Sequence, residues 1–396
     1  MNKDIWTKAA VVGSLWASVE IIMGSFFHNL QLPFAGTLLA VFTVTFVIAI
    51  LQIWPERGLI WRAGIIAALM KSISPSAVIL GPMTGIFFEA VLLELFIFLL
   101  GRNLFSYVVA GMMAVLSALF HKLITLLIIY GWDAVAILSN VYKFAMKQLS
   151  FTQVNPMDAV WILVSIYLFL GTLSALMGFR IGKKAVEQKE NQQSIATFDI
   201  SKADSFFSIS KDQKFSVYLL VFNILSVISI LFIINKWGLY WGLEAASVFL
   251  VYNLLRYKNA ARQFKRPALW MQLLILTLLA SLFYVEDSQI VYFSLKGVFV
   301  GLEMTLRAIV VVLGFSSISV ELRNPIIRTV LNKKGFSKLY NALGLAFSAL
   351  PAIMADVTKP KKMLKKPFNT IVGILLYTDS LYLAFMKFEQ ENNGKD

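Results

Sequence analysis

The sequence predicts an all-α protein that crosses a membrane many times. Hydrophobic residues make up 58% of its 396 residues and charged residues only 15%, a balance outside the range of ordinary soluble domains. The apolar residues also occur in runs long enough to cross a bilayer, which takes about 20 residues as a helix. At that length the chain has room for roughly eleven crossings.

Six apolar runs form the first part of the chain. The first is not followed by the small-residue cleavage pattern of a signal peptide, so we interpret it as a true membrane helix. Residues 133–150 place Lys143 and Lys147 on one face, which favours an interfacial helix between the fifth and sixth runs. The expected spans are 9–28, 34–54, 60–78, 81–100, 104–131 and 158–180.

A polar stretch, residues 183–214, separates this part from a second one and has the composition of a linker. We therefore expect a six-helix module over 1–182 and a module of about five helices over 215–396. The expected spans of the second module are 215–234, 238–255, 267–284, 290–318 and 368–386.

Lys and Arg in the short loops predict the orientation. Under alternate crossing the basic residues that flank the spans fall on one side, which the positive-inside rule makes cytoplasmic. The N-terminus is then cytoplasmic and the acidic C-terminal tail lies outside. The flanking basic residues include Lys3, Lys8, Arg57, Arg62, Arg102, Arg180, Lys183, Lys184, Arg256, Lys258, Arg262, Lys265 and Arg266.

One segment, Glu321–Pro367, carries ten Lys or Arg and only two acids. Such a segment cannot cross a bilayer, so we expect a folded cytoplasmic element that contacts a protein partner or anionic lipid headgroups. The formal net charge of +14 in so apolar a chain belongs mostly to cytoplasmic loops, which argues against nucleic acid as a partner. The absence of Cys and the presence of only two His disfavour thiol chemistry and transition-metal sites.

Four ionisable residues lie inside predicted spans, where charge is costly and usually faces a cavity or a partner. They are Glu20, Lys71, Glu89 and His121, on four different helices. One interpretation is that they line an outward-facing pocket for a small polar ligand. The alternative is that Glu20–Lys71 or Glu89–Lys71 are buried structural pairs.

Other polar and aromatic residues near the outer helix ends are candidates for the same ligand. His28 and Asn29 belong to the segment 26–33, which is suited to form a lid. Trp132, Asn140 and Trp161 are placed to stack on or hydrogen-bond a heteroaromatic ring. Anchoring at the membrane interface explains the aromatic residues equally well.

Two further patterns concern helix packing. Ala9, Gly13 and Ala17 recur every four residues, which places three small side chains on one helix face and allows close approach of another helix. Glu303 and Arg307 are one turn apart within a span, so we interpret them as a structural pair in which each neutralises the other.

The second part resembles the transmembrane coupling component of energy-coupling factor (ECF) transporters. The resemblance lies in GLEMTLRAIVVVLGFSS (301–317) followed by residues 321–360. In that family a span with an Arg and terminal small hydroxyl residues leads into two long cytoplasmic helices, the second with a Leu-Pro step. Here the corresponding residues are Arg307, Ser316-Ser317 and Leu350-Pro351. Asn332-Lys333-Lys334-Gly335 stands for the first ATPase-docking signature, and Lys359-Pro360-Lys361-Lys362 replaces the second.

The resemblance implies that the first part is the six-helix substrate-binding component, fused to the coupling component in one chain. It further implies a bacterial inner-membrane protein that takes up a water-soluble vitamin, its precursor or a related metabolite and uses helices about 320–366 for coupling. In ECF substrate-binding components, a small-residue face on the first helix meets the coupling component. Contacts with the ATPases are then expected from Arg323, Arg328, Lys333, Lys334, Gly335, Lys359, Lys361 and Lys362.

The chain has no G-x-x-x-x-G-K-[ST] phosphate loop, so ATP hydrolysis is expected on separate ABC-type ATPase chains, with no cofactor or metal bound here and no enzymatic activity of its own. The alternative is an ion- or proton-coupled secondary carrier in which Glu20, Lys71 and Glu89 are the coupling groups. A membrane transferase is disfavoured because no Asp-rich metal motif or nucleophile–His arrangement occurs.

Overall fold

The computed structural model describes residues 2–30, 34–71, 80–149, 155–191, 217–257, 264, 267–284, 293–322, 337–356 and 367–393. In these ranges every regular element is a helix. Seven helices are long and apolar enough to cross a membrane. They are α1 (Asn2–Asn29), α2 (Ala35–Ile53), α4 (Leu80–Leu100), α5 (Leu104–Tyr130), α7 (Pro156–Asn191), α8 (Val217–Arg256) and α10 (Leu295–Leu322). The expected multi-pass helical membrane protein is therefore confirmed at the level of helix content and length.

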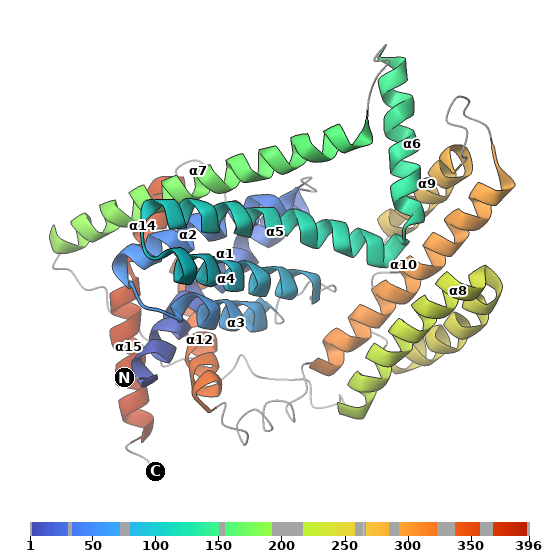
Figure 1. Ribbon diagram of the computed structural model, residues 1–396. Coiled ribbons are helices and arrows are strands. Elements are labelled where there is room, and N and C mark those ends of the chain that lie inside the picture. The colour runs from blue at the N-terminus through green and yellow to red at the C-terminus, as the bar shows by residue number, and fades with distance from the viewer. Residues whose placement is uncertain are drawn as a thin grey trace.

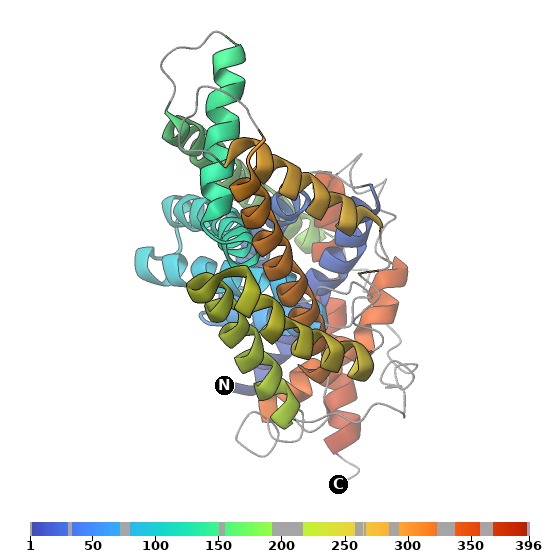
Figure 2. The same cartoon turned by 90° about the vertical axis from the view of Figure 1, so that its right-hand side faces the viewer.

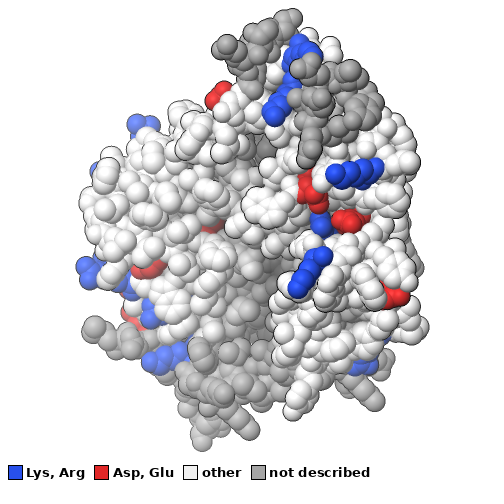
Figure 3. Space-filling view, turned by 45° about the vertical axis from the view of Figure 1, so that its right-hand side comes forward, with Lys and Arg blue, Asp and Glu red and all other residues white. Residues whose placement is uncertain are grey.

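The outer surface of these helices suits contact with lipid tails. Large apolar side chains lie exposed on several of them, for example Phe98 on α4, Phe169 on α7 and Val248 on α8. The face in Figure 3 is accordingly mostly without charge, with Lys, Arg, Asp and Glu confined to a few places. An exposed apolar surface of this extent is expected where lipid replaces water as the solvent.

The first part is a layered bundle in which α7 crosses α2 and α5 at very short range (Figure 1). Glycine makes this approach possible: a Cβ on Gly178 would lie 2.6 Å from the carbonyl oxygen of Thr45, and one on Gly171 would lie 2.6 Å from that of Gly111. Such small-residue contacts are typical of membrane helices. The short α3 (Leu59–Lys71) packs between α1 and α4.

The helix predicted between the fifth and sixth spans is present as α6 (Asp133–Gln148); its position at a membrane interface stays a prediction. In Figure 1 it runs steeply across the direction of α5 and α7 and reaches toward α9 (Pro267–Phe283). The sixth span extends further than predicted, because α7 continues to Asn191. The first residues of the expected linker are therefore helical, and residues 192–216 lie outside the described part.

The second part contains α8, α9 and α10, in which α10 packs on both α8 and α9; this group lies beside the first bundle in Figure 1 and in front of it in Figure 2. α8 is broken at Gly238, whose φ of 78° is open to glycine but strained for other residues. Its two arms fold back on each other, so that a Cβ on Gly242 would lie 2.6 Å from the Ile234 side chain. The predicted pair of helices 215–234 and 238–255 is thus confirmed.

The C-terminal helices return to the first part. α12 (Ser337–Asp356) packs on α1 and α3, and α14 (Pro367–Leu376) packs on α7. Their apolar residues, such as Ala346 and Leu375, are buried in the same hydrophobic core as those of α1 to α7. The sequence predicted two consecutive modules. It did not predict that α12 and α14, from the second module, pack on helices of the first.

The predicted span 368–386 is wrong. The chain turns at Tyr377, between α14 of 10 residues and α15 (Thr378–Asn393) of 16 residues, and neither reaches the length of about 20 residues that a crossing requires. Tyr382 bonds to Asp4 at the start of α1, and Asp379 forms an ion pair with Lys189 near the end of α7. The start of α15 therefore lies on the same side as the N-terminus, which also overturns the expected outside position of the tail.

Candidate functional site

Three of the four ionisable residues predicted inside spans come together in the first bundle. Glu20 on α1 and Lys71 at the end of α3 form an ion pair with 3.5 Å between Nζ and Oε2. Glu89 on α4 lies close enough to Glu20 for the two carboxyl groups to interact electrostatically. All three side chains are buried. We call Glu20, Lys71 and Glu89 the buried charge cluster.

The cluster is held in place by its neighbours. Lys71 Nζ donates to the backbone oxygen of Glu20 at 2.7 Å, and the Thr43 hydroxyl on α2 donates to Glu20 Oε1 at 3.2 Å. Gly24, one turn beyond Glu20, leaves room for the ammonium group, since a Cβ there would lie 3.0 Å from Nζ. The helices α1, α2, α3 and α4 thus meet at the buried charge cluster. Burying charged side chains in a membrane protein costs free energy, and such residues commonly mark a functional region.

His121 on α5 lies further along the same α4 surface. Its ring hydrogen-bonds to the backbone of Gly81 and faces Gly85, which is one turn from Glu89. The imidazole is only partly buried. The structure therefore confirms a Glu20–Lys71 pair, as the structural alternative predicted, and places Glu89 and His121 on its α4 side. Ligand contact by any of the four stays a prediction.

The residues proposed for the outer rim do not gather around the cluster. Trp132 is 77% exposed and Trp161 is 66% exposed, as suits interfacial anchors. Asn140 donates to the backbone oxygen of Phe283 at 2.8 Å, which connects α6 to α9.

The proposed lid is partly helical. α1 extends to Asn29, and Phe27 is buried in the bundle. His28 and Asn29 occupy the last turn of α1, with side chains outside the described part.

The small-residue face of α1 is used inside the chain. Ala9, Gly13 and Ala17 are on the buried side of α1, and a Cβ on Gly13 would lie 2.7 Å from the Ile66 side chain of α3. Gly13 therefore serves contact with α3, within the first part of the chain. α12 lies against α1 as well.

A second charged group connects the two parts of the chain. The sequence predicted its Glu303–Arg307 pair but not the contact with Asp133. Arg307 on α10 was expected to pair with Glu303, and it does, at 3.8 Å. It also contacts Asp133 at 3.2 Å and donates to the backbone oxygen of Tyr130 at 3.1 Å. Gly131 makes room for this arginine, because a Cβ there would lie 2.3 Å from it. We call Arg307, Asp133 and Glu303 the α6–α10 joint.

A third polar group lies at the end of α10 beside the arms of α8. Tyr257 donates to Glu321 at 2.7 Å, and Asn223 donates to the Tyr257 oxygen at 3.1 Å. Burial and the carboxylate of Glu321 raise the pKa of Tyr257. No sequence signal pointed to this group, since its members are far apart in the chain. It fixes the point at which α10 enters the basic segment.

The residues expected to contact ATPases lie outside the described ranges. These are Arg323, Arg328, Lys333, Lys334, Gly335, Lys359, Lys361 and Lys362. Of the two expected coupling helices, the described part contains α12, which corresponds to the second.

The described residues include no group of three or more His, Cys, Asp or Glu side chains able to hold a metal ion.

Compared with known proteins, the chain matches no family model, no curated protein and no solved structure. The buried charge cluster and the contacts between the two parts of the chain are therefore the features from which its function is inferred.

Proposed function

We propose that this chain is the membrane subunit of an ATP-driven importer of the ECF type. Its first bundle binds a small water-soluble vitamin or related metabolite, and its C-terminal part couples uptake to separate ABC-type ATPases. One observation carries the proposal: α12, which follows the first half of the basic segment, packs directly on α1 and α3. These two helices hold Glu20 and Lys71.

This packing supports a route from an ATPase to the bundle. A force that ATPase chains exert on the basic segment would reach α12 through a short stretch of chain. From α12 it would reach α1 and α3, whose relative position sets the Glu20–Lys71 distance. Rigid helices with two discrete arrangements are the usual means by which such coupling travels. The small-residue face that brings α1 against α3 keeps this pair of helices together.

The buried charge cluster favours one other function, an ion- or proton-coupled secondary carrier. The cluster holds two buried carboxyl groups and one lysine: Glu20 pairs with Lys71, and Glu89 lies near Glu20. An arrangement with one excess carboxylate is suited to take up and release a proton or small cation during transport. In that case no ATPase partner is needed.

Affinity purification tests the first proposal. The tagged full-length protein is isolated from its native membranes in mild detergent, and its partners are identified by mass spectrometry. One or two ABC-type ATPases should be recovered in stoichiometric amounts and be lost when Lys333 and Lys334 are both replaced by Ala. Lys143→Ala/Lys147→Ala is the matched control, because it removes two positive charges from α6. Recovery of the chain alone, folded and monodisperse, would refute the importer.

Uptake measurements separate the two functions. In cells, solute uptake by an ATP-driven importer should persist when an uncoupler collapses the proton gradient while ATP is maintained, and should stop in the Lys333→Ala/Lys334→Ala variant. A secondary carrier should behave in the opposite way in both measurements.

A further inference from the structure

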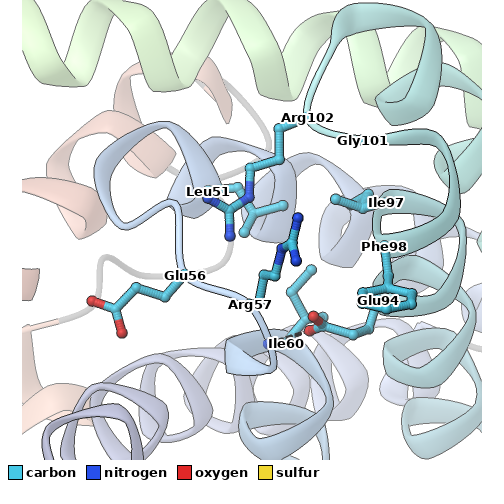
Figure 4. Close-up of a pocket in the computed structure, with 9 residues that line it drawn as sticks. All are labelled: Leu51, Glu56, Arg57, Ile60, Glu94, Ile97, Phe98, Gly101 and Arg102. Atoms are coloured by element: carbon cyan, nitrogen blue, oxygen red, sulfur yellow. Dashed lines mark hydrogen bonds between the residues drawn. The ribbon is translucent and has the colours of Figure 1, made fainter. Parts of the chain in front are cut away.

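A cavity of about 210 Å³ lies where α2 and α4 end and α3 begins, and none of its lining residues belongs to the buried charge cluster. Its polar side chains are Arg57, Arg102, Glu56 and Glu94, and its apolar wall is formed by Leu51, Ile60, Ile97 and Phe98. Figure 4 shows the two arginine side chains extending from separate loops into the same space. One loop joins α2 to α3 and the other joins α4 to α5.

Both acids at this cavity are engaged elsewhere. Glu56 forms an ion pair with Lys8 of α1 at 2.5 Å, and in Figure 4 its carboxylate points away from the arginines. Glu94 accepts from the backbone N–H groups of Gly58 at 2.6 Å and Ile60 at 3.0 Å, where it caps the start of α3. The Glu56 carboxylate is therefore directed away from the arginines, and both oxygens of Glu94 are bonded to the backbone at the start of α3.

The two arginines, in contrast, form no ion pair with any described carboxylate. Arg57 lies over the Phe98 ring, with 5.7 Å between its guanidinium carbon and the ring centre. This cation–π contact holds the guanidinium group beside the ring without using its N–H groups in an ion pair. Paired guanidinium groups are well matched to the oxygens of a phosphate group.

The surroundings distinguish a lipid phosphate from a soluble one. The cavity lies at the ends of α2 and α4, two candidate membrane helices, hence at the depth of headgroups. Phe98, Leu99 and Phe105 beside it are more than 60% exposed. A ligand whose phosphate enters the cavity would therefore have its acyl chains against an apolar, exposed surface.

We propose that this cavity binds the phosphate of an anionic phospholipid, with Arg57 and Arg102 as its ligands and Phe98 beside the glycerol backbone. Basic pockets between membrane helices commonly bind anionic headgroups. The site is independent of the transported solute and of the ATPases, so it holds whichever transport mechanism applies. Because the ion pair of Glu56 and the cap by Glu94 connect the cavity to α1 and α3, a bound lipid would brace these helices.

Native mass spectrometry of the full-length protein in detergent tests the proposal. Phosphatidylglycerol and phosphatidylcholine of equal chain length are added separately, and retained lipid is counted per protein. Phosphatidylglycerol should bind at least about tenfold more tightly than phosphatidylcholine. Arg57→Gln/Arg102→Gln should abolish this preference. Lys143→Gln/Lys147→Gln, which removes two charges from α6, should preserve it.

Competition with soluble anions and a conservative variant complete the test. Inorganic phosphate and glycerol 3-phosphate, added at the same concentration as the lipid, should not displace phosphatidylglycerol; displacement would assign the site to a soluble anion. If the glutamine variant does not elute as a single species, Arg57→Lys/Arg102→Lys replaces it and should weaken the preference, because Lys lacks the planar fork. An unchanged preference in the folded pocket variant, or an equal loss in the α6 control, would overturn the proposal.

Discussion

Arg307 of α10 and Asp133 of α6 are 174 residues apart in the chain and form an ion pair of 3.2 Å. The arginine side chain is 6% exposed, so the pair is largely removed from solvent. Asp133 occupies the first turn of α6, where a carboxylate is also favoured by the helix dipole. This contact is a polar connection between the first bundle and the group formed by α8 to α10.

Replacing Asp133 with Asn should destabilise the protein. Arg307 would keep only the longer contact with Glu303 and the Tyr130 carbonyl, and a buried charge that loses a partner costs about 3–5 kcal/mol when its burial is complete. Since Asp133 is partly exposed, we expect a loss toward the lower end of that range. Thermal unfolding of the purified protein in detergent measures it.

The matched control for this joint is Lys296→Met. Lys296 is an exposed cation on the same helix α10, and its removal should change the midpoint of unfolding little. The charge exchange Asp133→Arg/Arg307→Asp should recover part of the loss. Equal unfolding midpoints for Asp133→Asn and the wild type would show that the pair does not hold the two parts together.

Lys71→Met should lower stability more than Glu20→Gln/Lys71→Met does. In the single variant the buried Glu20 carboxylate remains without its cation, whereas the double variant removes both charges of the pair. Removal of one partner of a buried pair is more costly than removal of both. Together with Glu20→Gln and the wild type these variants form a double-mutant cycle, measured by thermal unfolding in detergent at one pH.

Lys143→Met on α6 controls for loss of a positive charge, since this lysine is exposed. If the cycle shows no coupling energy between Glu20 and Lys71, their proximity is incidental and the buried charge cluster loses its structural role. A loss of solute uptake in Glu89→Gln without loss of stability would in turn assign ligand or ion contact to Glu89.

Sequence periodicity and composition predicted most of the membrane helices, because a membrane helix can be recognised from the length of one continuous apolar run. The final span failed for a physical reason: residues 368–386 are apolar enough to cross, but the turn at Tyr377 is stabilised by contacts of α15 with Asp4 and Lys189, which are distant in sequence. Such contacts carry no periodic signal. The return of α12 to α1 was hidden for the same reason.

The candidate site was predictable only in part. Burial cost identified Glu20, Lys71 and Glu89, since charge inside a span requires a physical cause, and the pairing of Glu20 with Lys71 was one of the alternatives. The choice of Asp133 over Glu303 as the shorter contact of Arg307 was not predictable, because a one-turn spacing is visible in sequence and a contact across 174 residues is not. The arginine pocket likewise joins two separate loops.

Gly178→Ala should destabilise the bundle by about 1–3 kcal/mol, the usual cost of overpacking. The added Cβ would lie 2.6 Å from the Thr45 carbonyl oxygen and 3.1 Å from the Ile48 side chain, so α7 and α2 must separate. Gly36→Ala is the matched control, because no atom lies within 4 Å of its Cβ position. The control should be neutral or slightly stabilising, as Gly-to-Ala changes in helices usually are. Thermal unfolding of both variants in detergent gives the comparison, and equal midpoints would contradict the close approach.

Alkaline pH should release α15 from α1. Burial, together with the bond to the Asp4 carboxylate, raises the pKa of Tyr382 from 10.0 to about 12. Because the folded state favours the neutral phenol, its contribution to stability is complete below about pH 10 and is lost as the pH rises toward 12. Protease cleavage of α15 in the detergent-solubilised protein should therefore increase across this interval. Tyr382→Phe should lack this pH-dependent step, which separates it from the titration of Lys8 nearby. An identical alkaline increase in Tyr382→Phe would show that another group holds α15 to α1.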